Sequence, residues 1–179
     1  MLICSITWTP LIYIFHLGVA TTIIEAASRY REDVISGKCG GLVVLGGSNF
    51  GRGAPRDWAT KGPLSLGVRV VIAVSFDETY LSNLVQSGML PLQITKTIWG
   101  QLKGDELLNI DIKDRSNQEL RAGQMIPIQV VKGNDENDEK EITQIEAKLR
   151  LDNSYEVKLF RNGGVIRDML RKLNIDSQN

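Results

Sequence analysis

Compact apolar runs alternate with glycine-rich turns along the first half of the chain. Leu42 to Leu45 and Val68 to Val74 are short continuous apolar runs, typical of strands buried on both faces of a largely parallel sheet. Between them, Asp57 to Leu66 has the pattern of a helix, and a glycine-rich loop from Gly46 to Arg56 precedes it. This order of strand, loop, helix and strand predicts a βαβ unit with its functional loop at the carboxyl end of the first strand.

The patterns on either side of this unit predict further helices and strands. Apolar residues recur at helical spacing in Thr22 to Glu32, Asp77 to Gln86 and a closing helix from Val165 to Leu173. Strand-like patterns occur in Leu11 to Leu17, Leu90 to Ile94, Leu107 to Ile112, Ile126 to Val131 and Ile142 to Leu151. The acidic run Asn134 to Glu141 is expected to be a solvated hairpin tip or loop. Together these elements predict one α/β domain with a mixed, largely parallel sheet and flanking helices.

Composition and charge narrow the classes of partner. A chain of 179 residues fits a single domain, and 42% hydrophobic with 23% charged residues is the balance of an ordinary globular protein. Basic and acidic residues number 21 each, so no net field draws the chain to nucleic acid or anionic lipid. Neither a nucleic-acid partner nor a membrane partner is therefore predicted.

The cysteines and the N-terminal segment bear on the cellular compartment. Cys4 and Cys39 form no CxxC pattern, so they are interpreted as free thiols in a reducing compartment, which predicts a cytoplasmic location. Residues 1–24 carry no charge, and Leu11 to Leu17 is almost entirely apolar. No basic region precedes this run, which favours a buried strand; a signal peptide stays the alternative interpretation. The single histidine, His16, is given no functional role.

The loop Asn49 to Arg56 leads into a predicted helix. Unpaired N–H groups at a helix N-terminus attract carboxylates and phosphates, so this loop is a candidate anion site. Taken alone, glycines at this spacing are more typical of a tight turn without a ligand than of an anion site. The residues Asn49 to Pro63 as a whole, however, resemble the aconitase signature in which Gly-x-Gly-Ser-Ser-Arg-Asp-Trp-Ala precedes Lys-Gly-Pro.

Other matches to the aconitase and iron-regulatory protein family follow in order along the chain. They are Ala26 to Tyr30, Val71 to Ala73, Ser82 to Leu84, Gly88 to Leu92, Phe160 to Ile166 and Met169 to Lys172. The resemblance is to the C-terminal swivelling domain of that family and spans Gly18 to Leu173. It divides the chain into a divergent segment of residues 1–17, interpreted as a strand, a domain of residues 18–173 and a tail of residues 174–179. The family's domain begins earlier, with a strand and an arginine-bearing loop that residues 1–19 do not match.

The resemblance implies a hydro-lyase that isomerises citrate and isocitrate through cis-aconitate, a reaction of the tricarboxylic acid cycle, at an iron–sulfur cluster. This domain would supply the proton-abstracting serine and a substrate-binding arginine, which Arg56 matches, with Gly53 and Pro55 beside it. A guanidinium suits a bidentate grip on a carboxylate of a tricarboxylate substrate. The cluster cysteines belong to another part of the enzyme, so the prediction is that this chain binds no cofactor or metal and that a [4Fe-4S] cluster belongs to a missing or partner portion.

The sequence departs from the family at the serine pair. Ala54 stands at the general-base position, and a methyl group cannot accept a proton, although a positioned base contributes about 10² to 10⁴ in rate. Pro55 replaces the second serine and removes one N–H donor from the helix N-terminus. No catalytic residue is therefore predicted to be intact. The segment Asp77 to Leu81 also lacks the basic, histidine-containing stretch of the family, which would make an anionic ligand less welcome.

Three functional hypotheses follow. The first is a swivel domain inactive on its own, either a degenerate paralogue (a pseudoenzyme) or a fragment. The second is the small subunit of a two-chain hydro-lyase, with a cluster-bearing large partner. The third is a non-catalytic RNA-binding domain of the iron-regulatory type. At the level of single residues, Arg56 has a second interpretation, an ion pair with Asp57, and Trp58 and Met169 are predicted to be packing residues.

Overall fold

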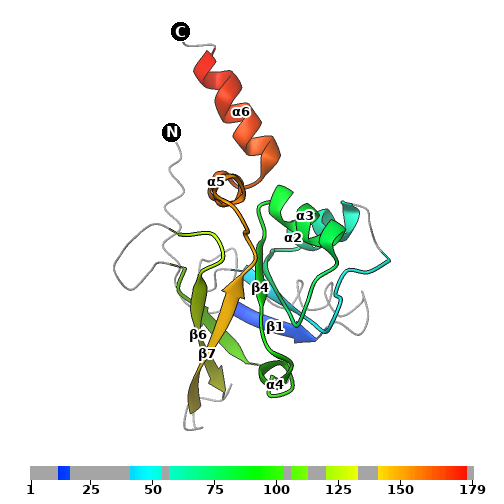
Figure 1. The fold of residues 1–179 in the computed structure, drawn as a ribbon, viewed down its shortest axis with the longest axis vertical. Helices are drawn as coiled ribbons and strands as arrows, with labels where there is room; N and C mark the ends of the chain where they lie inside the picture. Colours follow the sequence, from blue (N-terminus) through cyan, green and yellow to red (C-terminus); the bar gives the residue numbers. More distant parts are fainter. Residues whose placement is uncertain are drawn as a thin grey trace.

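The computed structural model describes residues 12–16, 41–53, 57–102, 106–112, 120–132 and 141–176, with backbone alone at 12–16 and 175–176. In this part of the chain the strands close into a barrel in the order β1, β2, β3, β4, β7, β6, β5 (Figure 1). The strands are β1 Ile12–His16, β2 Gly41–Gly46, β3 Val68–Ala73, β4 Leu90–Gln93, β5 Leu107–Ile110, β6 Met125–Lys132 and β7 Glu141–Leu149.

The barrel has a parallel part and an antiparallel part. β1 to β4 pair in parallel, whereas β4 with β7, β7 with β6, β6 with β5 and β5 with β1 pair antiparallel. The predicted mixed sheet of an α/β domain is confirmed. Closure was not predicted, because it depends on the pairing of Ile12 with Leu108, and residues so far apart in sequence leave no local periodicity.

Helices follow the parallel strands and the last antiparallel strand. They are α2 Trp58–Ser65, α3 Glu78–Gln86, α4 Lys96–Trp99, α5 Ser154–Asn162 and α6 Val165–Asp176. Side chains cap several of them: Asp77 accepts from Thr79 N and Tyr80 N, and Asn153 accepts from Glu156 N. α3 contacts α2, α5 and β4, whereas α6 contacts α5 and extends away from the barrel (Figure 1).

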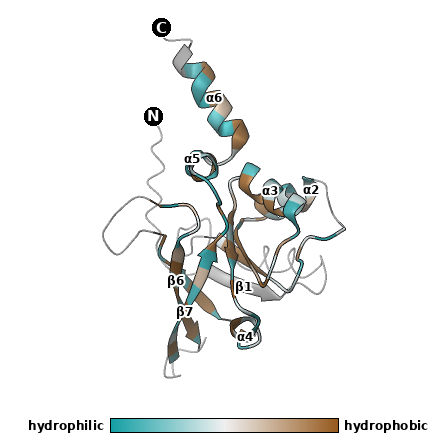
Figure 2. Cartoon of the chain, viewed as in Figure 1, coloured by the Kyte–Doolittle hydropathy of each residue, from teal (hydrophilic) through white to brown (hydrophobic). Residues whose placement is uncertain are grey.

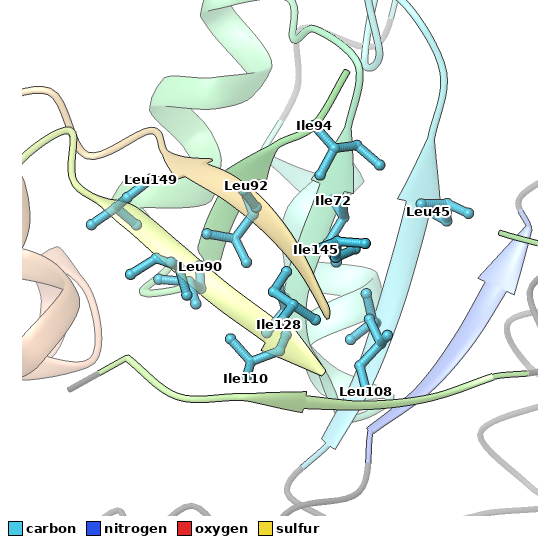
Figure 3. Packing of buried hydrophobic residues seen from close by; sticks show 14 of the residues in the cluster. Leu45, Ile72, Leu90, Leu92, Ile94, Leu108, Ile110, Ile128, Ile145 and Leu149 are labelled. Atoms are coloured by element: carbon cyan, nitrogen blue, oxygen red, sulfur yellow. The ribbon is translucent and has the colours of Figure 1, made fainter. Parts of the chain in front are cut away.

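Two apolar clusters hold these elements together. The larger one fills the space enclosed by the strands and includes Leu45, Ile72 and Leu92 (Figure 3). The smaller one lies between the parallel strands and α3, and includes Val44 and Leu84. Every residue of β2 is buried, because its side chains alternate between the two clusters, as the continuous apolar run predicted.

Most of the predicted elements are confirmed within the described residues. The predicted helix Thr22 to Glu32 lies outside them, as do residues 134–140 of the acidic run. Lys132 and Glu141 pair as neighbours across the antiparallel strands β6 and β7. α5 was not predicted. α6 confirms the closing helix and continues through Asp176, into residues 174–176 that the sequence assigned to the tail.

The prediction that Trp58 and Met169 are packing residues is wrong for this structure. Trp58 is 74% exposed at the start of α2, and Met169 is 58% exposed on α6. An amphipathic pattern reports that a helix has an apolar face, but it does not report which surface covers that face. Figure 2 shows apolar residues concentrated in the barrel strands, and others on α6, which stands clear of the barrel.

Candidate functional site: the glycine loop at the ends of β2 and β3

The glycine loop begins where β2 ends. A Cβ added to Gly46 would lie 2.4 Å from Cγ of Phe50, so the loop folds back closely over the end of the strand. Asn49 has a φ of 54°, in the left-handed region that asparagine tolerates better than most residues. The sequence therefore supplies a glycine and an asparagine at the two points where the turn demands them.

Backbone hydrogen bonds fix the loop to the connection between β3 and α3. Phe50 N donates to Ser75 O at 2.8 Å, and Asp77 N donates to Phe50 O at 2.8 Å. Asn49 N donates to the Ser75 hydroxyl at 2.7 Å. The carboxyl ends of two neighbouring parallel strands thus meet here, which is where open and mixed α/β sheets gather ligands.

An aromatic contact under the loop makes Gly51 a steric requirement. The rings of Phe50 and Tyr80 meet edge to face, with centroids 5.5 Å apart. A Cβ on Gly51, whose φ is 91°, would lie 2.2 Å from Cγ of Tyr80. Burial raises the pKa of the Tyr80 phenol to about 12, so the phenol stays neutral and acts as a packing group.

Ala54 at the general-base position and the predicted substrate-binding residues Pro55 and Arg56 lie outside the described residues. Gly53 is described; it is exposed, has a φ of 90°, and no described residue lies within 4 Å of the position a Cβ would take. The structure therefore brings Gly53 to the exposed side of the loop. The roles proposed for all four positions stay predictions.

Beyond the gap, α2 begins at Trp58 and is held by a polar contact to α3. Asp57 is the N-cap residue, but its carboxylate accepts from Lys61 Nζ instead of capping the helix. That hydrogen bond and the charge of Lys61 lower the pKa of Asp57. The buried Thr60 hydroxyl donates to Asp57 O at 2.8 Å and lies 3.0 Å from the Ser87 hydroxyl at the end of α3.

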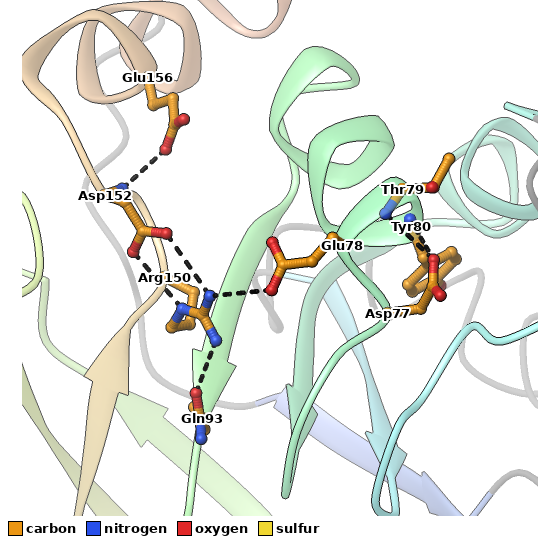
Figure 4. Close-up of polar contacts among 8 residues, drawn as sticks. All are labelled: Asp77, Glu78, Thr79, Tyr80, Gln93, Arg150, Asp152 and Glu156. Atoms are coloured by element: carbon orange, nitrogen blue, oxygen red, sulfur yellow. Dashed lines mark hydrogen bonds and ion pairs between the residues drawn. The ribbon is translucent and has the colours of Figure 1, made fainter.

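The start of α3 carries an ion-pair group that the sequence analysis missed. Arg150 donates to the Gln93 side chain at 2.8 Å, and its guanidinium lies 3.4 Å from the Asp152 carboxylate and 3.9 Å from Glu78 (Figure 4). Arg150 is largely buried, with 17% of its side chain exposed. The sequence contained a signal for this group: Arg150 lies near the end of the alternating run Ile142 to Leu151, and a charge that is buried there needs a partner.

The segment Asp77 to Leu81 stands where the resemblance implies a basic stretch, and most of its side chains make contacts that stabilise the fold. Asp77 caps α3, and Glu78 belongs to the Arg150 group. Tyr80 and Leu81 are each 5% exposed, so they face the smaller apolar cluster. The segment therefore offers no basic side chain to bind an anion.

Within the described ranges, no three His, Cys, Asp or Glu side chains lie together as a metal ion would need. Cys4 and Cys39 lie outside these ranges. The described side chains therefore do not fit an iron–sulfur cluster, and the prediction that a cluster belongs elsewhere stays a prediction. The same residues include no helix long and apolar enough to cross a membrane.

Comparison with known proteins places this geometry in a family. Residues 17–97 match the family model of the aconitase C-terminal domain. Aconitate hydratase A of Legionella pneumophila is 36% identical over 162 residues, and that of Bacillus subtilis is 35% identical over 158 residues. These matches cover 88% and 87% of this chain but only 16% of each relative, so the chain spans a small part of their length.

A solved structure supports the same architecture. The crystal structure of 3-isopropylmalate dehydratase from Methanocaldococcus jannaschii superposes with a TM-score of 0.54 at 19% identity, covering 94% of this chain and 96% of that chain. At this identity the superposition shows that the two chains share an α/β fold. The chain belongs to the aconitase family and corresponds to its C-terminal domain, as the resemblance predicted.

Proposed function

We propose that this chain is a swivel domain of a citrate–isocitrate hydro-lyase that has kept the loop scaffold but lost the proton-abstracting group. The residue that carries the proposal is Ala54, which the resemblance matches to the catalytic serine of the family. A methyl group neither accepts nor delivers a proton, so the chain alone is expected to give no turnover. Pro55 adds to the loss, because it removes an N–H that would face an anionic substrate.

The contacts around this position support the proposal that the chain has lost the proton-abstracting group while the fold of the loop is kept. The loop is tied to the β3–α3 connection through Phe50 and Asn49, and α2 is tied to α3 through Thr60. These contacts use backbone groups and side chains that the change at Ala54 leaves in place. The domain is therefore expected to present its loop to another surface even though the loop lacks a base.

Arg56 supports a second candidate, in which the chain still orients a tricarboxylate as the small subunit of a two-chain enzyme. The carboxylate of Asp57 already accepts a hydrogen bond from Lys61, which weakens the interpretation of Arg56 as its ion-pair partner. The dehydratase chain of almost equal extent also favours a domain of this size as a separate polypeptide. The cluster would then belong to a large partner.

The RNA-binding alternative has less support. Tyr80 and Leu81 are buried, and Glu78 brings a negative charge to the start of α3. An RNA site needs exposed cations to displace counterions from phosphates. A cytoplasmic location remains part of the proposal, because Cys4 and Cys39 form no CxxC pattern in the sequence.

The experiment is a hydration assay with cis-aconitate, using the purified chain alone and with a cluster-bearing aconitase body. We expect no turnover alone, and Ala54→Ser in the presence of the body should raise the rate by about 10² to 10⁴. Ala54→Gly is the matched control, because it changes the loop backbone without adding a hydroxyl. Turnover by the isolated unaltered chain would overturn the proposal, and an equal gain from both variants would mean that a different group is the base.

A further inference from the structure

Arg150 lies where the ends of four elements meet. It directly follows β7, and its side chain reaches the end of β4, the start of α3 and the connection that leads into α5 (Figure 4). The guanidinium donates to Gln93 Oε1 at 2.8 Å and to Asp152 at 3.4 Å, and lies 3.9 Å from the Glu78 carboxylate. The backbone N–H of Arg150 donates to Pro91 O at 3.0 Å. One residue thus joins elements that are far apart in the sequence.

The helices that begin near Arg150 oppose a cation at this position. The N-terminus of a helix carries a partial positive charge, and α3 and α5 both start here and contact each other. The Arg150 side chain is only 17% exposed, so water and salt screen little of this field. Glu78 in the first turn of α3 and Asp152 just before α5 supply the compensating negative charge. Arg150 therefore depends on both carboxylates at this position.

The contacts of Arg150 are suited to fixing geometry more than to adding stability. Exposed ion pairs contribute little free energy, and the Glu78 carboxylate is 85% exposed. A largely buried charge gives up hydration that its partners only partly replace, so an apolar side chain is often as stabilising at such a site. A planar guanidinium with five donors, however, fixes the directions of several acceptors at once. The spread of the acceptors over β4, α3 and the β7–α5 connection indicates a role in positioning these elements.

Arg150 is connected to the glycine loop first through β4. Gln93, which accepts its hydrogen bond, is the register partner of Ala73 at the end of β3. Ile94 N, one residue further along, donates to Ala73 O at 3.0 Å. The Ser75 carbonyl and hydroxyl that hold the loop lie two residues beyond Ala73. A shift of the end of β4 would therefore move the segment to which the loop is attached.

The second connection runs through the start of α3. Glu78, which contacts Arg150, directly follows Asp77, the residue that caps α3. Asp77 N donates to Phe50 O at 2.8 Å, and Phe50 N donates to Ser75 O at 2.8 Å. These two hydrogen bonds attach the loop on both sides of Phe50. Arg150 therefore acts on the segment before α3 through β4, and on α3 itself through Glu78.

We propose that Arg150 is a positioning residue for the glycine loop, which it sets in place by holding the ends of β4 and α3 together. The inference rests on the proposed function, since it concerns the same loop, and it adds a residue that lies outside the signature. Arg150 acts through Gln93 and Glu78 and not by contact with reacting atoms. A misplacement of about 1 Å can lower a rate about 10²-fold, so Arg150 is expected to affect kcat once Ala54→Ser supplies a base.

Amide hydrogen exchange of the full chain, followed by NMR, tests the positioning role directly. Arg150→Met removes the guanidinium and is expected to speed exchange at Phe50 N and Asp77 N about tenfold or more, because local opening of these two bonds governs their exchange. Exchange at Leu42 N, which is hydrogen-bonded at the other end of β2, should change less than about threefold. Lys148→Met removes an exposed charge two residues away and is the matched control, which should leave all three amides within about twofold.

A second variant disturbs the fold less than the loss of Arg150. Glu78→Gln removes a largely exposed charge and leaves the contacts with Gln93 and Asp152 in place. It should speed exchange at Asp77 N about threefold in the unaltered chain and have no effect in the Arg150→Met background, because the two residues act through one contact.

Three results of the exchange experiment would overturn the positioning role. One is equal acceleration of all three amides by Arg150→Met, which would mean that the residue only stabilises the fold. Another is the absence of any change in Arg150→Met or in Glu78→Gln. The last is an equal effect of Glu78→Gln in both backgrounds, which would mean that Glu78 acts without Arg150.

An activity assay separates this role from the proposed function. In the presence of the cluster-bearing body, Arg150→Met added to Ala54→Ser should lower kcat about tenfold or more and leave KM within about threefold, and Arg150→Lys should recover part of the loss. No turnover by Ala54→Ser itself would contradict the proposed function, while the exchange rates would still decide the role of Arg150. Faster exchange at the loop together with an unchanged kcat would overturn the positioning role and leave the proposed function standing.

Discussion

The glycines of the loop differ in why the structure needs them. Gly46 and Gly51 are required by ring atoms that would lie 2.4 Å and 2.2 Å from an added Cβ, whereas no described atom lies within 4 Å of that position at Gly53. All of them look alike in the sequence. The motif therefore predicted the loop correctly, but it did not separate glycines needed for packing from the one whose openness suits a ligand.

Asp168 provides a prediction on pH. Hydrogen bonds from Lys172 and Asn162 lower the pKa of this carboxyl, so it stabilises the fold fully above the unfolded pKa of about 3.9. The contribution is lost as the pH falls through the lower pKa of the folded state. Asp168→Asn is expected to lower the melting temperature at pH 7 and to reduce its fall on acidification. Melting curves from pH 7 to pH 3 test this, with exposed Glu141→Gln as control; parallel curves for Asp168→Asn and the unaltered chain would contradict it.

Elements were predictable where the pattern is local. The strand β2 and the amphipathic helix α6 were both predicted, since each pattern depends on residues close together in the sequence. α5 was not predicted, because Gly163 and Gly164 are typical of a turn and were interpreted as a turn alone, although that turn ends a helix. Gly163 is the left-handed C-cap, with a φ of 78°, so the same residues mark the end of a helix as readily as a loop.

The contact between α3 and the α5–α6 turn yields a prediction on stability. Gly88 has a φ of 74°, and a Cβ there would lie 2.5 Å from the backbone carbon of Gly163. Gly88→Ala is expected to cost more than about 2 kcal/mol, since it adds a backbone clash to the left-handed penalty of about 1–2 kcal/mol. Gly62→Ala in α2 is the matched control, because no atom of the described residues lies within 4 Å of its Cβ position, and it should stabilise by about 0.5–1 kcal/mol. Urea unfolding measures both; equal midpoints for the two variants would refute the contact.

At the scale of the whole molecule, the closed barrel is the property that the sequence did not predict. The pattern of alternation gave the strands, yet closure depends on β1 pairing with β2 on one side and β5 on the other. Residues 1–16 lie outside the match to the family model, which begins at residue 17. The structure nevertheless uses residues 12–16 to join the parallel part of the sheet to the antiparallel part.

This placement of β1 gives the last prediction. Removal of residues 1–17 would leave β2 and β5 with unpaired edges and would open one side of the cluster formed by Leu45 and Leu108. Exposed strand edges pair with other chains, so the truncated protein is expected to aggregate rather than to unfold reversibly. Light scattering during a thermal ramp tests this, and removal of residues 177–179 is the control, which should leave the curve unchanged. A truncated chain that stays monomeric and keeps the melting temperature of the full chain would mean that β1 adds little to closure, and that the parallel strands β2 to β4 are held by α2 and α3 alone.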